Sequence, residues 1–318
     1  MNEELKLAEN FQLDIIKLKT EISKQVIGQA DAVEGVLNCI FSNGHALLLG
    51  VPGLAKTLLI KTISQALDLS FNRIQFTPDL MPSDITGAEI LDEQRKFSFI
   101  KGPIFANIIL ADEINRTPPK TQSALLEAMQ EKMVTVAGKT LALDQPFFVL
   151  ATQNPIEQEG TYSLPEAQLD RFMFNILLDY PSIEEEKAIV NLTTGAIQRE
   201  VETIISKEKI VAYQKLLRSV PVADNVIDYA VNLVAKTRLN RPETAKIVKE
   251  MVAYGAGPRA SQYLILGAKT HALMHGKLSP DIADVKIIAK QVLRHRIVKN
   301  YQAEAENITT DSIIEELL

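Results

Sequence analysis

Five short strand-like runs recur along the first 180 residues of the chain, and helical patterns alternate with them. Several of the runs consist almost wholly of apolar residues, as is typical of strands that are buried on both faces. The runs cover residues 46–49, 71–76, 108–111, 147–151 and 174–178. Helices are expected at 57–67 and 118–131, the second with Thr117 as N-cap and Pro118 in its first turn. This alternation predicts a parallel sheet with helices on both faces.

The strand pattern fades from Pro181 onward, and apolar residues then recur at helical spacing. The expected amphipathic helices cover residues 184–194, 207–217, 223–236, 260–274 and 282–298. We therefore predict an α/β fold with two domains. Residues 1–180 are expected to form a nucleotide-binding domain around a five-stranded parallel sheet, and residues 181–318 a smaller all-α lid domain.

Two hairpin insertions, near 88–100 and 134–143, are expected within the first domain. In the first, residues 88–91 and 96–100 flank the polar turn at 92–95. In the second, a turn that contains Lys139 separates two short apolar segments. The hairpins either carry the mechanical work of the molecule or are solvated excursions, and the sequence favours neither interpretation for Lys139.

The first apolar run leads into a loop that is typical of phosphate binding, Gly50-Val51-Pro52-Gly53-Leu54-Ala55-Lys56-Thr57, with Leu58 next in the following helix. Such a loop wraps phosphates in backbone N–H groups. Its lysine reaches the β- and γ-phosphates, and its threonine hydroxyl ligates Mg²⁺. Ala55 stands where the general pattern has glycine, so the fit is imperfect. The alternative is a strand-to-helix turn with a solvated lysine.

Two adjacent carboxylates, Asp112 and Glu113, end the strand-like run at 108–111. In a phosphate-loop enzyme Asp112 would hold Mg²⁺, directly or through water. Glu113 would orient the water that attacks the γ-phosphate. By themselves two acids at a strand end are more often solvated turn residues, but the lysine loop about fifty residues earlier favours one shared site.

Two later polar residues fit the same site. Asn154 follows the run at 147–151 and could hold the attacking water or a γ-phosphate oxygen. Arg171 ends a short expected helix and could stabilise the charge that builds on the γ-phosphate of a neighbouring subunit. The alternatives are a strand-end cap for Asn154 and a surface ion pair with Asp170 or Glu166 for Arg171.

The order of these motifs, followed by Gly257-Pro258-Arg259-Ala260-Ser261, resembles the MoxR family of AAA+ ATPases. The resemblance covers nearly the whole chain, and its most specific segments are residues 50–57, 75–87, 102–107, 110–116 and 151–157. It implies that Lys56 and Thr57 form the Walker A pair and that Asp112 and Glu113 form Walker B.

The same resemblance implies roles for residues outside these two motifs. Asn154 corresponds to sensor 1, Arg171 to the arginine finger and Arg259 to sensor 2. Ile27 and Gly28 belong to a segment that lies against the adenine. Arg259 is expected at the start of a lid helix, where it could couple the position of the lid to the nucleotide state.

The function implied by the resemblance is Mg²⁺-dependent ATP hydrolysis by a homo-oligomeric ring, expected to be a hexamer. The ring would remodel or mature partner proteins in a chaperone-like manner, among them proteins with a von Willebrand A domain that carries a metal-ion site. The alternatives are a nucleic-acid motor, a magnesium-chelatase ATPase subunit, and a non-hydrolysing scaffold that is gated by nucleotide.

Composition narrows these choices. The 318 residues are 46% hydrophobic and 23% charged, which suffices for a large core. The net charge of −6 argues against a chain built mainly to grip nucleic acid, although a ring can still line its pore with lysines. The polar first ten residues and the lack of a long apolar stretch predict a cytoplasmic protein without membrane insertion.

Cysteine and histidine suggest no further chemistry. The single cysteine, Cys39, excludes an internal disulfide and is expected to be a buried structural thiol. His271 and His275 lie four residues apart on an expected helix and could share a metal. Because no cysteine or acid is placed beside them in the sequence, two ordinary helix positions are the preferred interpretation.

Overall fold

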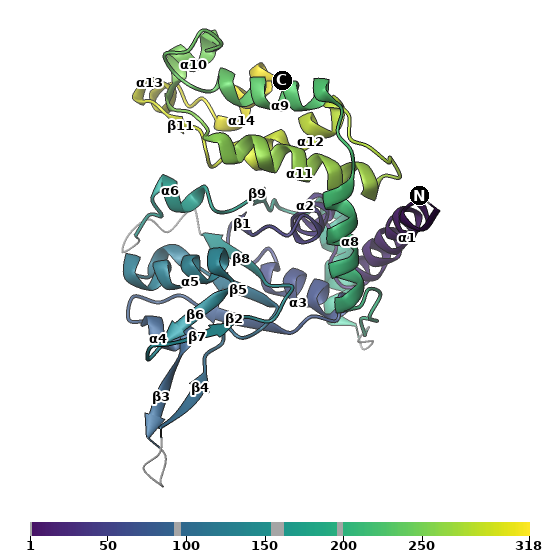
Figure 1. Ribbon diagram of the computed structural model, residues 1–318, viewed down its shortest axis with the longest axis vertical. Helices are drawn as coiled ribbons and strands as arrows, with labels where there is room; N and C mark the ends of the chain where they lie inside the picture. The colour runs from purple at the N-terminus through teal and green to yellow at the C-terminus, as the bar shows by residue number, and fades with distance from the viewer. Residues whose placement is uncertain (1, 92–96, 154–161, 196–199) are drawn as a thin grey trace.

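A computed structural model describes residues 2–91, 97–153, 162–195 and 200–318 (Figure 1). Its central sheet has five strands in the order β2-β5-β8-β1-β9, and every pair of neighbours is parallel. The strands are β1 (Ala46–Leu49), β2 (Phe71–Gln75), β5 (Ile108–Asp112), β8 (Phe148–Gln153) and β9 (Phe174–Leu177). The predicted parallel sheet is therefore confirmed, with strand ends displaced by at most two residues.

Helices cover both faces of the sheet, because successive strand residues point to opposite sides. Leu48 and Leu110 pack into a core with α1 (Asn2–Ser23), α2 (Ala30–Phe41) and α3 (Lys56–Ala66). Leu47 and Ile109 pack into a second core with α5 (Pro119–Glu131). The short helices α4 (Pro82–Thr86) and α6 (Glu166–Leu169) complete this part of the chain (Figure 1).

Thr117 is not the N-cap of α5, contrary to the prediction. The N-cap is Pro118, one residue later. The Thr117 hydroxyl instead donates a hydrogen bond to the carbonyl oxygen of Thr77, 3.1 Å away, and the residue is fully buried. A tertiary hydrogen bond has here replaced the local one that the sequence pattern suggested.

The N-terminal helix α1 was not anticipated. Phe11, Ile15, Leu18 and Ile22 recur at spacings of three and four residues and are buried in the core. The carboxylate of Asp14, on the same helix, accepts hydrogen bonds of 2.6 Å from the Tyr213 hydroxyl and from the Lys209 ammonium of α8 (Lys207–Ser219). These contacts hold α8 against α1.

The C-terminal part is mainly helical, and in Figure 1 it stands above β9, the edge strand of the sheet. It contains α9 (Asp224–Lys236), α10 (Lys246–Met251), α11 (Pro258–Met274), α12 (Ile282–Leu293), α13 (Tyr301–Ala305) and α14 (Thr310–Leu317). A short antiparallel pair, β10 (Val252–Tyr254) and β11 (Val298–Lys299), was not expected. Because Val298 pairs with Tyr254, the helix predicted over 282–298 ends at Leu293.

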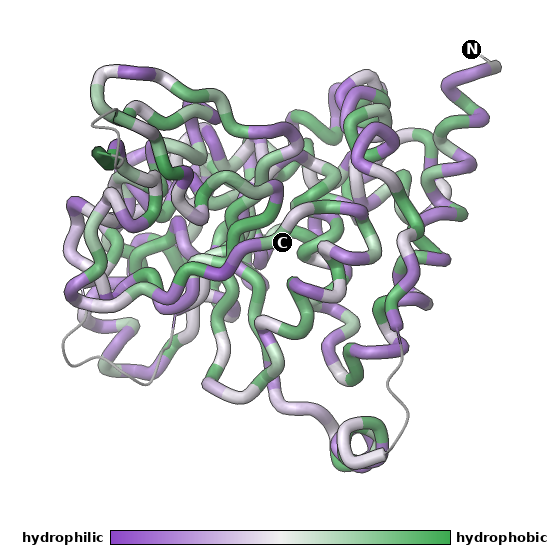
Figure 2. Tube along the Cα trace, turned by 90° about the horizontal axis from the view of Figure 1, so that it is seen from below, coloured by the Kyte–Doolittle hydropathy of each residue, from purple (hydrophilic) through white to green (hydrophobic). Residues whose placement is uncertain are grey.

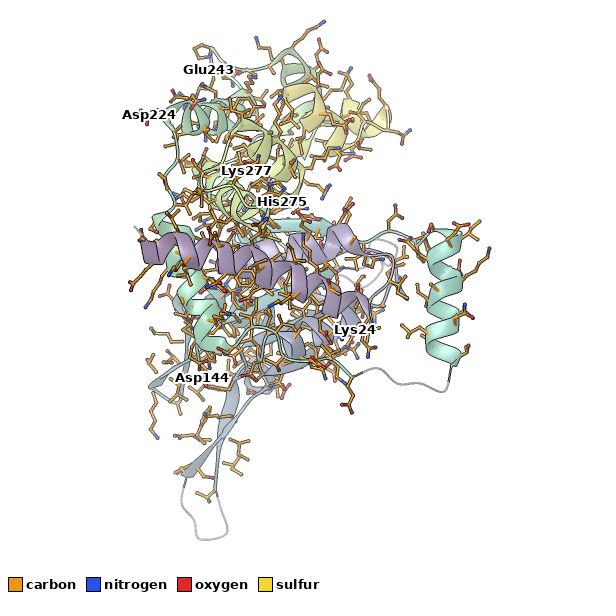
Figure 3. The ribbon with its side chains drawn as sticks, turned by 90° about the vertical axis from the view of Figure 1, so that its right-hand side faces the viewer. Lys24, Asp144, Asp224, Glu243, His275 and Lys277 are labelled. Atoms are coloured by element: carbon orange, nitrogen blue, oxygen red, sulfur yellow. The ribbon has the colours of Figure 1, made fainter. Side chains whose placement is uncertain are left out.

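The helix α7 (Ile183–Thr194) stands apart from the rest of the molecule (Figures 2 and 3). None of its residues is buried. It begins with a capping box, in which the Ser182 hydroxyl and the Glu185 carboxylate each accept a hydrogen bond from the other residue's backbone N–H. The helix is therefore supported locally at its start rather than by a packed face.

Two antiparallel hairpins lie where the sequence predicts them. They are β3 (Gly87–Leu91) with β4 (Phe97–Lys101), and β6 (Met133–Val136) with β7 (Lys139–Ala142). The first projects away from the sheet (Figure 1). An ion pair of 2.8 Å between Lys139 Nζ and Glu89 Oε1 joins the two hairpins, so Lys139 has a structural partner.

Candidate functional site

A cavity of about 390 Å³ lies at the carboxyl ends of β1, β5 and β8. Ligands of open α/β sheets bind at this edge of the sheet. Its lining brings together the loop after β1, the end of β5 and polar residues of β2 and β8. The lining residues are Val51, Pro52, Gly53, Leu54, Ala55, Lys56, Thr57, Arg73, Gln75, Asp112, Glu113 and Thr152.

The loop after β1 follows a path that its residues make accessible. Gly53 has a φ of +90°, and an added Cβ would meet nothing within 4 Å, so backbone conformation rather than space favours glycine. At Gly50 an added Cβ would lie 2.9 Å from the carbonyl oxygen of Leu178, after β9. Ala55, the departure from the general pattern, adopts a left-handed φ of +54° directly before α3.

Lys56 is the first residue of α3, and its ammonium donates a hydrogen bond to the carbonyl oxygen of Gly50. Burial lowers the pKa of Lys56, and the negative charges of Asp112 and Glu113 oppose that shift. The ammonium group therefore lies where a polyanion would relieve its desolvation. Thr57 lines the same cavity and offers a hydroxyl oxygen there.

Asp112 is fixed by two elements that flank β5. The guanidinium of Arg73, on β2, donates to Asp112 Oδ2 from Nε at 3.0 Å and from Nη2 at 2.6 Å. The Thr152 hydroxyl, on β8, donates to Asp112 Oδ1 at 2.6 Å. Charge-assisted hydrogen bonds of this kind hold a carboxylate in one orientation.

Glu113 turns out of the strand into the cavity. Its φ is +58°, and its backbone N–H donates to the Thr152 hydroxyl at 2.8 Å. Its carboxylate Oε2 accepts a hydrogen bond from Gln75 Nε2 at 2.9 Å and lies 3.2 Å from Arg116 Nη1. Thr152 thus links the two acids, because its oxygen accepts from one residue and donates to the other.

Sequence reasoning did not identify Arg73, Gln75 and Thr152 as site residues. Arg73 and Gln75 alternate with the buried Ile74 along β2, so both point to the same face. The parallel register pairs Gln75 with Asp112. Two polar residues at spacing two near the end of a strand were the available signal, but the sequence did not show that β2 neighbours β5.

The described residues that line this cavity do not include Arg171 or Arg259. Arg259 Nη1 donates to Asp170 Oδ2 at 2.9 Å, and the buried Arg296 donates to Asp170 Oδ1 at 2.8 Å. Asp170 is therefore paired with Arg259 and Arg296, not with Arg171 as the surface alternative supposed. Tyr263 donates through its hydroxyl to the Arg171 carbonyl oxygen at 3.4 Å.

The remaining predicted site residues are Ile27, Gly28, Leu58 and Asn154. Asn154 is outside the described residues. Gly28, with a φ of +75°, packs where an added Cβ would lie 3.0 Å from Pro181 Cβ and 3.2 Å from Glu185 Oε2, and Ile27 directly precedes it. Leu58 is 40% exposed on α3, beside rather than within the cavity lining.

The expectation for Cys39 agrees with the structure, and the structure changes one premise behind the interpretation of the two histidines. Cys39 is fully buried, and burial raises the pKa of its thiol. The interpretation of His271 and His275 rested on the lack of an acid beside them. Glu34, more than 230 residues earlier in the chain, lies next to both rings.

The donor set of the cavity suits ATP and Mg²⁺. The loop offers backbone N–H groups and an ammonium to phosphates. Thr57 and Asp112 offer the oxygen ligands that Mg²⁺ prefers.

Among the described helices, none is both long and apolar enough to cross a membrane.

Comparisons with known proteins show which family the chain belongs to. The profile of the ATPase family associated with various cellular activities matches residues 45–174, and that of the AAA lid domain matches residues 244–317. Chaperone MoxR1 of Mycobacterium tuberculosis is 44% identical over 94% of this chain and 79% of its own. Protein YeaC of Bacillus subtilis is 42% identical over 95% of this chain and 92% of its own.

A crystal structure of a Cytophaga hutchinsonii protein superposes with a TM-score of 0.92 at 43% identity. It covers 98% of this chain and 95% of that protein. The similarity to this structure therefore covers the whole fold and not only the single motifs. The chain is an ATPase with a nucleotide-binding site, and it belongs to the MoxR family of AAA+ ATPases.

Proposed function

We propose that the chain hydrolyses Mg²⁺-ATP in the cavity around Lys56 and uses the energy, as an oligomeric ring, to remodel partner proteins. The observation that carries this proposal is the convergence of Lys56, Asp112 and Glu113 on one cavity at the carboxyl edge of the sheet. The loop and the two acids are more than fifty residues apart in the chain, and a shared cavity gives them a common ligand.

In this proposal each group has a separate task. The loop N–H groups and the Lys56 ammonium bind the β- and γ-phosphates. Thr57 and Asp112 would hold Mg²⁺, which would neutralise the charge of the phosphates. Glu113 orients the attacking water. The hydrogen bond from Gln75 engages Oε2 of Glu113, and a carboxylate has a second oxygen with which it can orient water.

One chain does not supply the whole proposed site. Asn154, Arg171 and Arg259 are the remaining residues assigned to it. Arg171 and Arg259 are outside the cavity lining, and Asp170 binds the Arg259 guanidinium. We therefore assign Arg171 to the γ-phosphate of a neighbouring subunit in a homo-oligomer, with a hexamer as the expected size. A guanidinium supplied in trans stabilises the charge of the transition state.

A protein partner is favoured over nucleic acid as the target of the ring. The relative from Mycobacterium tuberculosis is named a chaperone. The chain carries a net charge of −6, which opposes non-specific binding to phosphate backbones. We propose further that the partner carries a von Willebrand A domain and that the chain acts in the cytoplasm. Ile27, Gly28 and Leu58 are proposed to contact the nucleotide.

The test is affinity capture with Glu113→Gln, which is expected to bind ATP and to turn it over at least about a hundredfold more slowly. Lys56→Ala, which cannot hold ATP, is the control for the empty state. Bound material is identified by mass spectrometry and by nucleic-acid staining. Proteins enriched only by Glu113→Gln in Mg²⁺-ATP, and remodelled by the wild type, support the proposal. Enrichment of nucleic acid alone would contradict the proposal and would indicate a nucleic-acid motor.

A further inference from the structure

A second cluster of metal-ligating side chains, which shares no residue with the lining of the ATP cavity, lies where α2 meets α11. Glu34 comes from α2, His271 from the last turn of α11, and His275 is the C-cap of the same helix. One ligand atom from each residue lies within 4.8 Å of the other two. Figure 3 shows His275 where the C-terminal helices face the N-terminal ones.

The hydrogen bonds of the two rings fix which nitrogen faces Glu34. Asp284 Oδ1, which is fully buried, lies 2.7 Å from His271 Nδ1. The carbonyl oxygen of His271 lies 2.9 Å from His275 Nδ1. Because a carboxylate and a carbonyl oxygen both accept, each Nδ1 carries a proton, and in the neutral imidazole Nε2 has the lone pair that a metal ion needs. Histidine ligands of metals are oriented in this way.

Both Nε2 atoms approach the same oxygen of Glu34. Oε1 of Glu34 is 3.4 Å from His275 Nε2 and 3.7 Å from His271 Nε2. Both separations exceed the usual length of an N–H···O hydrogen bond, about 2.7–3.2 Å. Ligand atoms about 2.0–2.1 Å from a tetrahedral Zn²⁺ are about 3.3 Å apart, which the observed separations approach.

The charged groups around the cluster leave its ligand atoms accessible. Lys19 Nζ binds the other carboxylate oxygen of Glu34, Oε2, at 2.6 Å. Lys277 Nζ lies 3.2 Å from both oxygens of Asp284 and 3.0 Å from Asp281 Oδ2. Each lysine is thus paired with a carboxylate, and Glu34 Oε1 remains directed at the imidazoles.

We propose that Glu34, His271 and His275 bind a first-row divalent cation of the zinc class. Two imidazoles and a carboxylate are the ligands of many zinc sites, and a fourth position is left for water. Side-chain exposures of 42% for His275 and 32% for Glu34 give the ion a route from solvent, while the 8% exposed His271 anchors it. The ion would tie α2 of the nucleotide-binding part to α11 of the lid.

The site concerns a metal other than the Mg²⁺ of the ATP cavity, and its residues take no part in the proposed hydrolysis. It is tested without nucleotide, on the untagged full-length chain, so that neither ATP nor an affinity tag competes for the ion. A failure of the proposed ATPase mechanism therefore leaves this result unaffected.

The experiment titrates Zn²⁺ into the wild type, His275→Ala, Glu34→Gln and the matched control Asp31→Asn by calorimetry. Asp31 is an exposed acid in the first turn of the same helix as Glu34. We expect one ion per chain, weakened at least about tenfold by either ligand substitution and unchanged in the control. Co²⁺ provides a second readout, because a tetrahedral site gives it intense visible absorption.

Thermal unfolding separates ligation from misfolding. Zn²⁺ is expected to raise the unfolding temperature of the wild type and of Asp31→Asn, and to leave that of His275→Ala unchanged. Since His275 is half-exposed, its replacement opens no core cavity. Equal Zn²⁺ affinity in all four proteins, or no binding to the wild type, would overturn the proposal. The cluster would then be an ion pair between Glu34 and protonated histidines.

Discussion

At the scale of single residues, the two acids that end β5 are held in different ways. Asp112 accepts three hydrogen bonds, from Arg73 twice and from Thr152. The carboxylate of Glu113 accepts a hydrogen bond from Gln75 and lies 3.2 Å from Arg116, whose side chain is 40% exposed. Asp112 is thus suited to stay in place, and Glu113 to orient water, as their proposed roles require.

Lys56 is the residue whose loss we expect to affect ATP binding most. Its ammonium is the cation that the phosphate loop itself supplies to the cavity lining. We expect Lys56→Ala to abolish ATP binding, because the charge-assisted contact to two phosphates is lost. The matched control is Lys61→Ala, an exposed lysine on the same helix. Affinity for a fluorescent ATP analogue reports the result, and equal affinities in both variants would contradict the assignment.

His45 gives the fold a predictable dependence on pH. Its partly buried ring accepts a hydrogen bond from Val149 N–H at Nδ1 and donates to the Met129 carbonyl oxygen from Nε2, so it is neutral. Burial lowers its pKa to about 4. Between pH 6.5 and 4 the unfolded chain therefore binds a proton that the folded chain does not, and the free energy of unfolding falls as pH falls.

The size of this effect approaches about 1.4 kcal/mol per pH unit for one proton. Urea unfolding at pH 7 and pH 5 measures it. His45→Gln is expected to be less stable than the wild type at pH 7 but to lose less stability between the two pH values. The same loss in both proteins would show that His45 does not contribute. His295, whose pKa burial also lowers, contributes in the same direction in both.

Residues of the site could be predicted from sequence where they belong to one local motif. Lys56, Thr57, Asp112 and Glu113 follow strands whose apolar runs are plain, and they meet as expected. Glu34 illustrates the opposite case. Its proximity to His271 and His275 depends on how α2 packs against α11, which no local pattern encodes.

At the scale of elements, apolar runs predicted strands well because both faces of the sheet are covered. Helix ends were less predictable. The helix from Ile282 stops at Leu293 because the chain beyond it pairs with β10. The amphipathic α1 was not predicted, although Phe11, Ile15, Leu18 and Ile22 are spaced as in a helix, because the polar and acidic first ten residues obscure its apolar face.

The hairpin formed by β3 and β4 exposes apolar side chains, and we predict that it contacts the partner. Phe97 is 74% exposed, and Ile90, Leu91 and Ile100 are exposed beside it. Phe97→Ser is expected to leave basal ATP turnover within about twofold of wild type, since the hairpin projects away from the sheet (Figure 1). In the Glu113→Gln background it should abolish partner capture.

Tyr301→Ser is the matched control for the hairpin prediction, because Tyr301 is an 89% exposed aromatic residue on α13. Quantitative mass spectrometry of the captured proteins measures the difference. Capture that survives Phe97→Ser, or that Tyr301→Ser reduces equally, would assign partner binding to another surface.

At the scale of the whole molecule, the lid and the sheet meet close to the residues proposed to respond to nucleotide. Asp170 binds Arg259 of α11 and Arg296, which follows α12. Arg171 directly follows Asp170 in the chain. A change in lid position would therefore move the arginine that is assigned to the neighbouring subunit, which offers a physical link between ATP sites around a ring.

The central claim, an ATPase whose sites are shared between subunits, is tested most directly by mixing two inactive variants. Lys56→Ala keeps Arg171 but cannot bind ATP, and Arg171→Ala binds ATP but lacks the arginine for its neighbour. In randomly mixed rings at equal amounts, about a quarter of the interfaces combine an intact loop with an intact arginine. The account predicts that ATP turnover returns in the mixture, to about that fraction of wild type. Turnover that stays at the level of the separate variants, in rings shown to contain both chains, would contradict it.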